Sequence, residues 1–361
     1  MISMKKGRVI KILEKLKKKT KLIVSIDGEE ALAINYSDLT GEAKINDMVI
    51  INTTAVELKL GTGGCHFVIS NFNNTHQELQ GKGHIMKLRY TPLQLKVLAA
   101  EEQQSPYHYL FNEFTSLNGL PVIAGILHSM LTPIVSTLKY INSNIKIAYI
   151  MTDGAALPLS FSDTVDYLRN NDLIDTTITT GHAFGGDIET INIYNGLVAA
   201  KEIAKCDIAV VTMGPGIVGT GTPYGFSGIE QGLVLNAVTD LGGFSIGVPR
   251  ISFSDNRVRH YGMSHHSLTI FSKICKTKCN IILPLLPKKE KKIIYNQIED
   301  LNIIEKHNII EIDGSILLDA LKHFNLNVKT MGRDYDADPF YFLACSAAAM
   351  YGFNYLIASP K

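Results

Sequence analysis

The pattern of apolar and polar positions changes near residue 90. From Gly7 to about Ser70, short runs alternate apolar and polar residues, which is typical of strands with one buried face. Asp27-Gly28 separates two such runs and predicts a two-residue hairpin, because both central positions of that turn need positive φ. We therefore expect a small β-rich domain, a strongly curved sheet or barrel, in residues 1–90.

Residues 91–361 follow a different rhythm, in which continuous apolar runs are followed by small-residue loops and helical segments. Strands that are covered on both faces of a parallel sheet have such runs without alternation. Together the runs predict a Rossmann-like α/β layered domain with a mainly parallel sheet and right-handed crossovers. The five runs are 121–127, 145–151, 176–180, 207–213 and 243–249.

Composition narrows the class of protein. Of 361 residues, 46% are hydrophobic, so the chain can bury a sizeable core and is not intrinsically disordered. Lys and Arg total 35 and Asp and Glu total 34, a balance that disfavours a dedicated nucleic-acid binder. No window holds about 18 uninterrupted apolar residues, and the N-terminus lacks an apolar signal segment. We expect a cytoplasmic protein with no membrane partner and with free thiols.

In an open parallel sheet, ligands bind outside the carboxyl ends of the strands, so the loops after the five runs are the candidate site. His182 lies between glycines after the third run and is a candidate general base or metal ligand. Asp187 is a candidate orienting carboxylate, or alternatively only the cap of a helix over 188–205. Asp153, after the second run, is a candidate base or ligand, or a turn residue.

The loop after the fourth run is rich in glycine. Its glycines have GxGxxG spacing, but the loop continues, and Arg250 stands where a dinucleotide site needs an acid, so an NAD site is disfavoured. Backbone N–H groups and hydroxyls in this loop suit an anion such as phosphate or carboxylate, unless the glycines serve only a demanding loop conformation. The candidate ligand-binding residues are Gly214, Gly216, Gly219, Thr220, Thr222 and Ser227.

The segment after the fifth run is dense in arginine and histidine. Arg257 and Arg259 can clamp a carboxylate or phosphate, and His265 can share protons with it; a solvated loop is the alternative. Histidines can also bind a divalent metal, for which the candidate ligands are His182, Asp187, His265 and His266. Cys275 and Cys279 are four positions apart without a second pair, so zinc is not expected there.

Five longer stretches carry a family resemblance. They are LGTGGCHFVISNF (60–72), GHAFGGDIETINIYNGL (181–197), MGPGIVGTGTPYGFSG (213–228), RISFSDNRVRHYGMSHHSLT (250–269) and MGRDYDADPFYF (331–342). With them the chain resembles a bacterial family catalogued as domain of unknown function 3866. The resemblance implies a cytosolic protein of similar two-part layout, and it supplies no activity and no site residue.

Three hypotheses for the function follow from these residues. The first is an enzyme, a hydrolase or transferase, that acts on a small anionic metabolite or nucleotide at the strand-end crevice, with a divalent metal as one option. The second is a non-catalytic nucleotide-sensing or regulatory protein, and the third is an NAD(P)-dependent oxidoreductase. Acid and base residues within reach of one another favour the enzyme, and an anion cradle without them favours the sensor. A homo-oligomer is compatible with all three.

Overall fold

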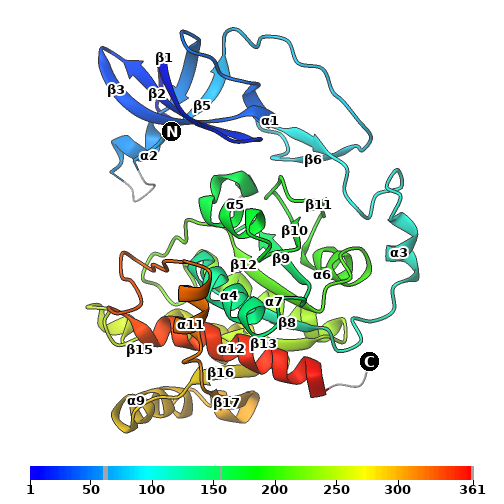
Figure 1. The fold of residues 1–361 in the computed structure, drawn as a ribbon, viewed down its shortest axis with the longest axis vertical. Helices are drawn as coiled ribbons and strands as arrows, with labels where there is room; N and C mark the ends of the chain where they lie inside the picture. Colours follow the sequence, from blue (N-terminus) through cyan, green and yellow to red (C-terminus); the bar gives the residue numbers. More distant parts are fainter. Residues whose placement is uncertain (60–63, 155–156, 359–361) are drawn as a thin grey trace. The chain divides into compact units, whose positions relative to one another are not determined.

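The computed structural model describes residues 1–59, 64–154 and 157–358 (Figure 1). The chain separates into two compact units, Met1–Val97 and Leu98–Lys361. This division falls seven positions after the boundary that the change of hydrophobic pattern predicts.

The first unit is a closed barrel of five strands in the order β1-β2-β3-β5-β4. As predicted, Asp27-Gly28 closes a hairpin in which Ile26 pairs with Glu29, and both turn residues have positive φ, 53° and 89°. Alternate apolar side chains, among them Leu22 and Val24, fill the interior. The bounds are β1 Met4–Lys15, β2 Lys19–Ile26, β3 Glu29–Tyr36, β4 Met48–Asn52 and β5 His66–Asn71, with the short helices α1 Ser37–Thr40 and α2 Thr54–Glu57 and the small hairpin of β6 Ile85–Lys87 and β7 Leu95–Val97.

The second unit is built on an eight-stranded sheet in which every neighbouring pair is parallel, so the predicted α/β layered class is confirmed. All five predicted runs are strands of this sheet, and three further strands extend it at its edges. The order is β11-β10-β9-β12-β8-β13-β16-β17. The bounds are β8 Pro121–Gly125, β9 Ile147–Thr152, β10 Thr176–Thr179, β11 Ile188–Glu189, β12 Ile208–Met213, β13 Phe244–Val248, β16 Asn280–Pro284 and β17 Asn308–Ile312.

Helices cover the sheet in two layers. One layer contains α6 and α7, which contact each other, and the other contains α4, α11 and α12, which also contact one another. Both layers bury the apolar strands, which explains why the strand sequences do not alternate. The bounds are α3 His108–Glu113, α4 Leu131–Ile141, α5 Asp163–Asn170, α6 Ile193–Glu202, α7 Glu230–Asp240, α8 His265–Thr269, α9 Lys288–Glu299, α10 Ile303–Lys306, α11 Leu317–His323 and α12 Pro339–Ala358.

Helix α12 is long and apolar enough to span a membrane, judged by length and composition alone. It contacts β8, β13, β16 and β17, and Figure 1 shows it in red, running across the sheet. Half of its most apolar stretch is buried within the protein. These contacts are those of a core helix in an α/β layered fold.

The order of the strands places a candidate ligand crevice near the centre of the sheet. The chain leaves the central strand β8 in both directions, toward β9 and β10 on one side and toward β13 on the other, and β12 returns between β9 and β8. Such a reversal of strand order leaves a gap between the loops at the carboxyl ends of the neighbouring strands. The loops after β8, β9 and β12 meet at this gap.

The segment after β10 corrects one prediction. Residues Ile188–Glu189 form the edge strand β11, which pairs with β10, rather than the start of a helix. Helix α6 begins only at Ile193, and the side chain of Asn192 caps it by accepting a hydrogen bond from Asn195 N. Asp187 therefore caps no helix. The composition of residues 188–189 is compatible with a helix. They form a strand because the open edge of β10 offers hydrogen-bond partners to their backbone groups.

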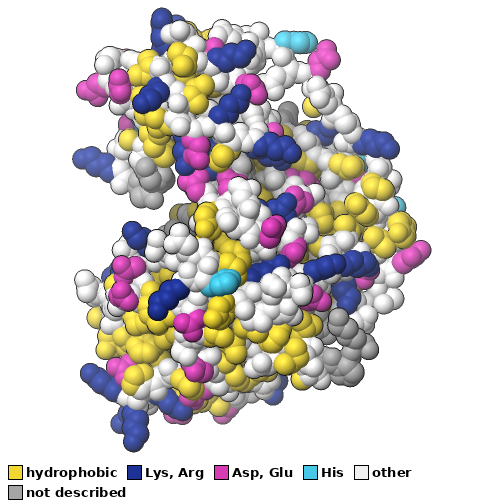
Figure 2. Space-filling model, in the orientation of Figure 1, with side chains coloured by type: hydrophobic (Ala, Val, Ile, Leu, Met, Phe, Trp, Pro, Cys, Tyr) yellow, Lys and Arg dark blue, Asp and Glu magenta, His cyan; other side chains and the backbone are white. Residues whose placement is uncertain are grey.

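One face of the molecule shows how its charged side chains are distributed. On the face that Figure 2 shows, Lys and Arg side chains in dark blue are interspersed with Asp and Glu side chains in magenta. This distribution agrees with the near-equal totals of 35 basic and 34 acidic residues.

Candidate functional site

A cleft of about 530 Å³ opens at the carboxyl ends of β8, β9 and β12. Its lining includes His128 after β8, Ser162 at the start of α5, and Gly214 and Gly216 after β12. A fourth wall comes from residues 327–331, which follow α11. The cleft thus lies at the reversal of strand order, where ligand crevices of parallel sheets occur.

His128 ties three of these elements together. Its Nε2 lies 2.7 Å from Ser162 Oγ, and its Nδ1 lies 3.2 Å from the hydroxyl of Tyr149 on β9. Burial lowers the pKa of His128 to about 4, so the imidazole is neutral at physiological pH. The uncharged ring of His128 therefore lines the cleft and forms hydrogen bonds with its neighbours.

Two carboxylates lie side by side at the end of β9. Glu230, the first residue of α7, accepts hydrogen bonds from the Thr152 hydroxyl and from Gly154 N. Burial, with the nearby charge of Asp153 as a further contribution, raises the pKa of Glu230 to about 7. Asp153 Oδ2 also accepts a hydrogen bond of 3.1 Å from His182 N. A carboxyl group with a pKa near 7 is suited to general acid–base work.

Of these two carboxylates, only Asp153 was predicted from the sequence. The sequence indicated Asp153 and His182, and the structure brings them together: the backbone N–H of His182 donates to the Asp153 carboxylate. Gly181 is essential to this approach, because its φ is +63° and a Cβ there would lie 2.2 Å from the Asp153 carboxylate. Glu230 was not predicted, since an acid in the first turn of a helix is ordinary and only its burial against β9 makes it unusual.

Three histidines form a compact cluster after β13. His260 ends a short 3₁₀ turn, and His265 and His266 begin α8. Each ring offers one nitrogen, and these nitrogens lie within 4.8 Å of one another. His265 Nε2 and His266 Nδ1 are buried and have no hydrogen-bond partner. Such unsatisfied nitrogens need an explanation, and a bound metal ion is one.

The imidazoles of the cluster are neutral. Burial, together with nearby arginine and histidine charges, lowers the pKa of His260 and of His266 to about 3. Burial also lowers the pKa of His265, with Arg259 as the next contribution. Because neutral imidazole is the metal-binding form, no proton competes for these nitrogens near pH 7.

The glycine-rich loop connects the cluster to the cleft. Phe226 stacks on His266 with ring centroids 4.0 Å apart, and a Cβ on Gly219 would lie 3.6 Å from the same ring. Gly216 of the same loop lines the cleft. Three residues of chain span at most about 11 Å, so the cleft wall and the histidine cluster are close neighbours.

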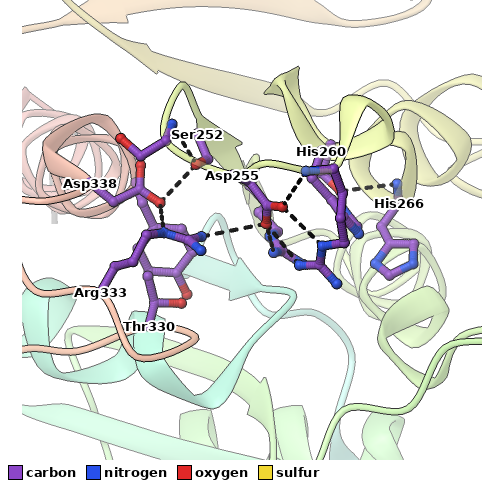
Figure 3. Close-up of polar contacts among 12 residues, drawn as sticks. Ser252, Asp255, His260, His266, Thr330, Arg333 and Asp338 are labelled. Carbon is purple, nitrogen blue, oxygen red and sulfur yellow. Dashed lines mark hydrogen bonds and ion pairs between the residues drawn. The ribbon is translucent and has the colours of Figure 1, made fainter.

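An ion-pair network lies beside the histidines (Figure 3). Asp255 is 2.7 Å from Arg257 NH2, 3.2 Å from Arg250 NH2 and 3.5 Å from Arg333 NH2. Figure 3 shows Arg333 between Asp255 and Asp338, and its Nε is 2.9 Å from Asp338 Oδ2. Hydrogen bonds from Arg257 hold the pKa of Asp255 well below its usual range. Three guanidinium groups and two carboxylates leave this network net positive.

The same network reaches the cleft. Thr330 lines the cleft, and its backbone exchanges two hydrogen bonds, 2.8 and 2.9 Å long, with the backbone of Arg333. The Ser252 hydroxyl donates to Asp338 at 2.8 Å and ties the network to the segment after β13. The contact of Arg333 with Asp255 spans 78 positions, so no local pattern in the sequence indicates it.

Several predicted residues lie outside this arrangement. Asp187 forms an ion pair with Arg169, 2.6 Å apart, and accepts from Thr177 N, the second residue of β10. It therefore lies toward the amino end of that strand, and it is not among the described residues that group with His265 and His266. His182 is likewise absent from the described group of close histidines.

The hydroxyls of the glycine-rich loop mainly satisfy the loop itself. Thr220 Oγ1 lies 2.9 Å from Thr222 Oγ1 and 3.1 Å from Gly225 O, and Ser227 Oγ accepts from Val218 N at 3.1 Å. The helix that a dinucleotide fingerprint needs directly after its glycines begins only at Glu230. Of the predicted ligand-binding residues in the described chain, Gly214 and Gly216 line the cleft.

Fold and site together define an α/β protein with a parallel eight-stranded sheet, an N-terminal β-barrel and a polar site at the carboxyl edge of the sheet. The chain belongs to the family described as "Protein of unknown function (DUF3866)", whose model matches residues 32–349. This match confirms the resemblance seen in the sequence. No curated protein and no solved structure matches the chain. The function therefore has to be argued from the site.

Proposed function

We propose that the protein is a metal-assisted enzyme, a hydrolase or transferase, that acts on a small anionic molecule at the carboxyl edge of the sheet. The observation that carries this proposal is the cluster of His260, His265 and His266, whose ligand nitrogens lie within 4.8 Å of one another. Three protein ligands and one open position are typical of catalytic zinc. A metal ion held there lowers the pKa of a bound water, which supplies a nucleophile near neutral pH.

Arginines next to the cluster support an anionic substrate. Arg257 is 44% exposed at its side chain while Asp255 fixes one side of its guanidinium group. Arg259, whose charge contributes to the lowered pKa of His265, lies beside the same ring. These positive charges oppose a metal cation, and an anion bound by the arginines offsets that repulsion. Metal and substrate anion should therefore each strengthen the binding of the other.

The cleft provides room for the rest of the substrate. Its wall residue Gly216 and the His266 neighbour Gly219 are only three positions apart. A molecule that occupies part of the 530 Å³ cleft can therefore extend to the histidines. Glu230 lies at the same edge of the sheet, four residues after Phe226, and its pKa of about 7 suits it to accept the proton that a nucleophilic water loses.

A second candidate function is the non-catalytic sensor. It is favoured by one observation: of the predicted catalytic residues His182, Asp153 and Asp187, none is among the residues that line the described cleft. A sensor binds its ligand through the glycine backbone and the hydroxyls of the cleft and turns nothing over. Turnover that depends on metal separates the two candidates.

The test combines metal binding with hydrolysis. Isothermal titration with Zn²⁺, Mn²⁺ and Mg²⁺ is followed by turnover of a phosphomonoester, a phosphodiester and a carboxyl ester. We expect the His265→Gln/His266→Gln variant to lose one equivalent of bound metal and the metal-stimulated hydrolysis. The control His323→Gln changes an exposed histidine of α11 and should behave as the unaltered protein. Equal metal stoichiometry and affinity in the double variant and the unaltered protein would overturn the proposal.

A further inference from the structure

At the amino edge of the same sheet, Cys275, Cys279 and His307 form a second cluster. Cys275 follows a π-helical turn, Ile270–Ile274, Cys279 immediately precedes β16, and His307 immediately precedes β17. All three are buried, with exposures of 2%, 1% and 3%. Three segments thus place two thiols and one imidazole at a single buried point.

The distances within this cluster fit one tetrahedral ion. Cys275 Sγ lies 3.8 Å from Cys279 Sγ, and Cys279 Sγ lies 3.4 Å from His307 Nδ1. Zinc with Zn–S bonds of about 2.3 Å and Zn–N bonds of about 2.0–2.1 Å holds two sulfurs about 3.8 Å apart and a sulfur and a nitrogen about 3.6 Å apart. All three ligand atoms lie within 4.8 Å of one another.

The orientation of His307 also matches a metal ligand. Its Nε2 lies 2.8 Å from the carbonyl oxygen of Phe271, so Nε2 carries the proton and donates it there. Nδ1 consequently presents a lone pair toward Cys279, whose backbone N–H donates to it at 3.3 Å and whose Sγ lies 3.4 Å away. Metal-binding histidines usually donate their other N–H to a carbonyl or carboxylate in this way.

The charge balance favours an ion at this buried place. When Zn²⁺ binds, each of the two thiols releases one proton to solvent as its sulfur forms a bond to the metal. One Zn²⁺, two thiolates and a neutral imidazole together carry no net charge, which removes the cost of burying an isolated ion.

We propose that Cys275, Cys279 and His307 bind one structural Zn²⁺ at the amino edge of the sheet. The ion joins the end of the π-helical turn to the first residues of β16 and β17. The Cys275 thiol donates a hydrogen bond to the carbonyl oxygen of Thr277, 3.4 Å away, and it gives up this proton when it binds the metal. This site is independent of the proposed enzymatic function, since it shares no ligand with the histidine cluster at the other edge.

Two alternatives compete with a metal site and define its test. A Cys275–Cys279 disulfide requires the sulfurs to close from 3.8 Å to about 2.05 Å. A chain of hydrogen-bonded thiols requires only weak S–H donors. Neither alternative binds Co²⁺ through sulfur, whereas a thiolate site gives an intense sulfur-to-cobalt charge-transfer absorption in the near ultraviolet.

The full-length chain is purified without added chelator, and its zinc is measured by mass spectrometry before the metal is exchanged for Co²⁺. We expect zinc in the isolated protein and a sulfur-to-cobalt band after exchange. Cys279→Ser and His307→Gln should each lower the zinc content by one equivalent and weaken or remove the band. The control Cys206→Ala alters a buried cysteine outside the cluster and should leave both unchanged.

The measurement on the unaltered protein decides the matter even where a variant fails to fold. The absence of a sulfur-to-cobalt band in that protein overturns the proposal, and so does a Cys275–Cys279 disulfide found by mass spectrometry after alkylation without reductant. The His265→Gln/His266→Gln variant should keep the full band. Loss of binding at one edge is therefore distinguishable from loss at the other.

Discussion

One helical segment carries a different ligand chemistry at each end. Helix α8 begins with His265 and His266 at the carboxyl edge of the sheet, and the π-helical turn that continues it leads into Cys275 at the amino edge. About ten residues separate the two clusters, which is roughly 15 Å of helix. The two ends can therefore be compared within one continuous element.

The difference between the ends lies in their surroundings. The carboxyl-edge cluster has only imidazoles, exposed arginines nearby and a cleft within reach. The amino-edge cluster has two thiols and one imidazole, all at most 3% exposed. Catalytic zinc keeps an open position, whereas structural zinc is closed and contains sulfur. Because both groups contain three side chains, burial and ligand type are what distinguish the proposed reactive site from the proposed structural one.

The largest effect should come from the amino edge. Cys279→Ser removes a thiolate from the proposed structural site, and we expect a loss of about 3 kcal/mol in the free energy of unfolding, or roughly 6–12 °C in Tm. Calorimetry on protein loaded with zinc measures this shift. Cys206→Ala serves as the control for the loss of a buried sulfur. If Cys279→Ser and the control have the same Tm, the proposed zinc site does not stabilise the fold.

At the carboxyl edge the same kind of change should affect turnover instead of stability. His266→Gln removes one imidazole ligand, and we expect metal-dependent hydrolysis to fall about 100-fold or more, with Tm in the absence of metal changed by only a few degrees. Steady-state kinetics with saturating metal measures the loss. Because Phe226 stacks on His266, Phe226→Leu tests packing alone and should retain most of the activity. If both variants lose activity equally, the role of the ring is packing.

A smaller effect is expected for the arginines beside the histidines. Arg257→Ala removes a charged hydrogen-bond donor, so the KM for an anionic substrate should rise roughly tenfold or more while metal binding in the absence of substrate tightens. Titrations with and without substrate measure both quantities. Lys289→Ala on α9 is the matched control for the loss of one exposed positive charge. Weaker metal binding in Arg257→Ala would contradict the proposed repulsion between arginine and metal.

The acid pair predicts a pH dependence of stability. The folded pKa of Glu230, about 7, lies above its ordinary value of 4.5, so its stabilising contribution is complete below pH 4.5 and is lost as pH rises through 7. The charged group that contributes to this raised pKa is Asp153. The Thr152 hydroxyl and Gly154 N donate hydrogen bonds to the Glu230 carboxyl group. In Glu230→Gln this loss should be absent. Urea midpoints of both proteins from pH 4.5 to 8 should diverge with rising pH, and parallel curves would contradict a raised pKa.

The smallest effect is expected for Asp187, which the structure places outside the site. Its ion pair with Arg169 is partly exposed, so Asp187→Asn should cost less than about 1 kcal/mol. Metal binding at both edges should be unchanged. A loss of bound metal in this variant would restore Asp187 as a ligand.

The fold was largely predictable because its signals are local. Five continuous apolar runs marked the central strands, and Asp27-Gly28 marked the first hairpin. β16 and β17 were not predicted, since each has only five residues and β16 is flanked by lysine-rich stretches. β11 could not be predicted, because two residues pair there only through the free edge of β10.

The site was predictable only in part because it depends on contacts between distant segments. His265 and His266 were selected as metal ligands from their density in one loop, and the structure adds His260. Zinc at Cys275 and Cys279 was not expected, because His307 follows Cys279 by 28 positions and no spacing rule connects them. The burial of Glu230 likewise exists only once α7 docks at the end of β9.

The account depends on two separate metal sites at the two ends of one helical segment. The most direct measurement is diffraction from crystals grown with zinc, with data collected on both sides of the zinc absorption edge. The account predicts two anomalous peaks, one among His260, His265 and His266 and one among Cys275, Cys279 and His307. A map with no peak at either cluster would contradict it, and a single peak would refute the site that lacks one.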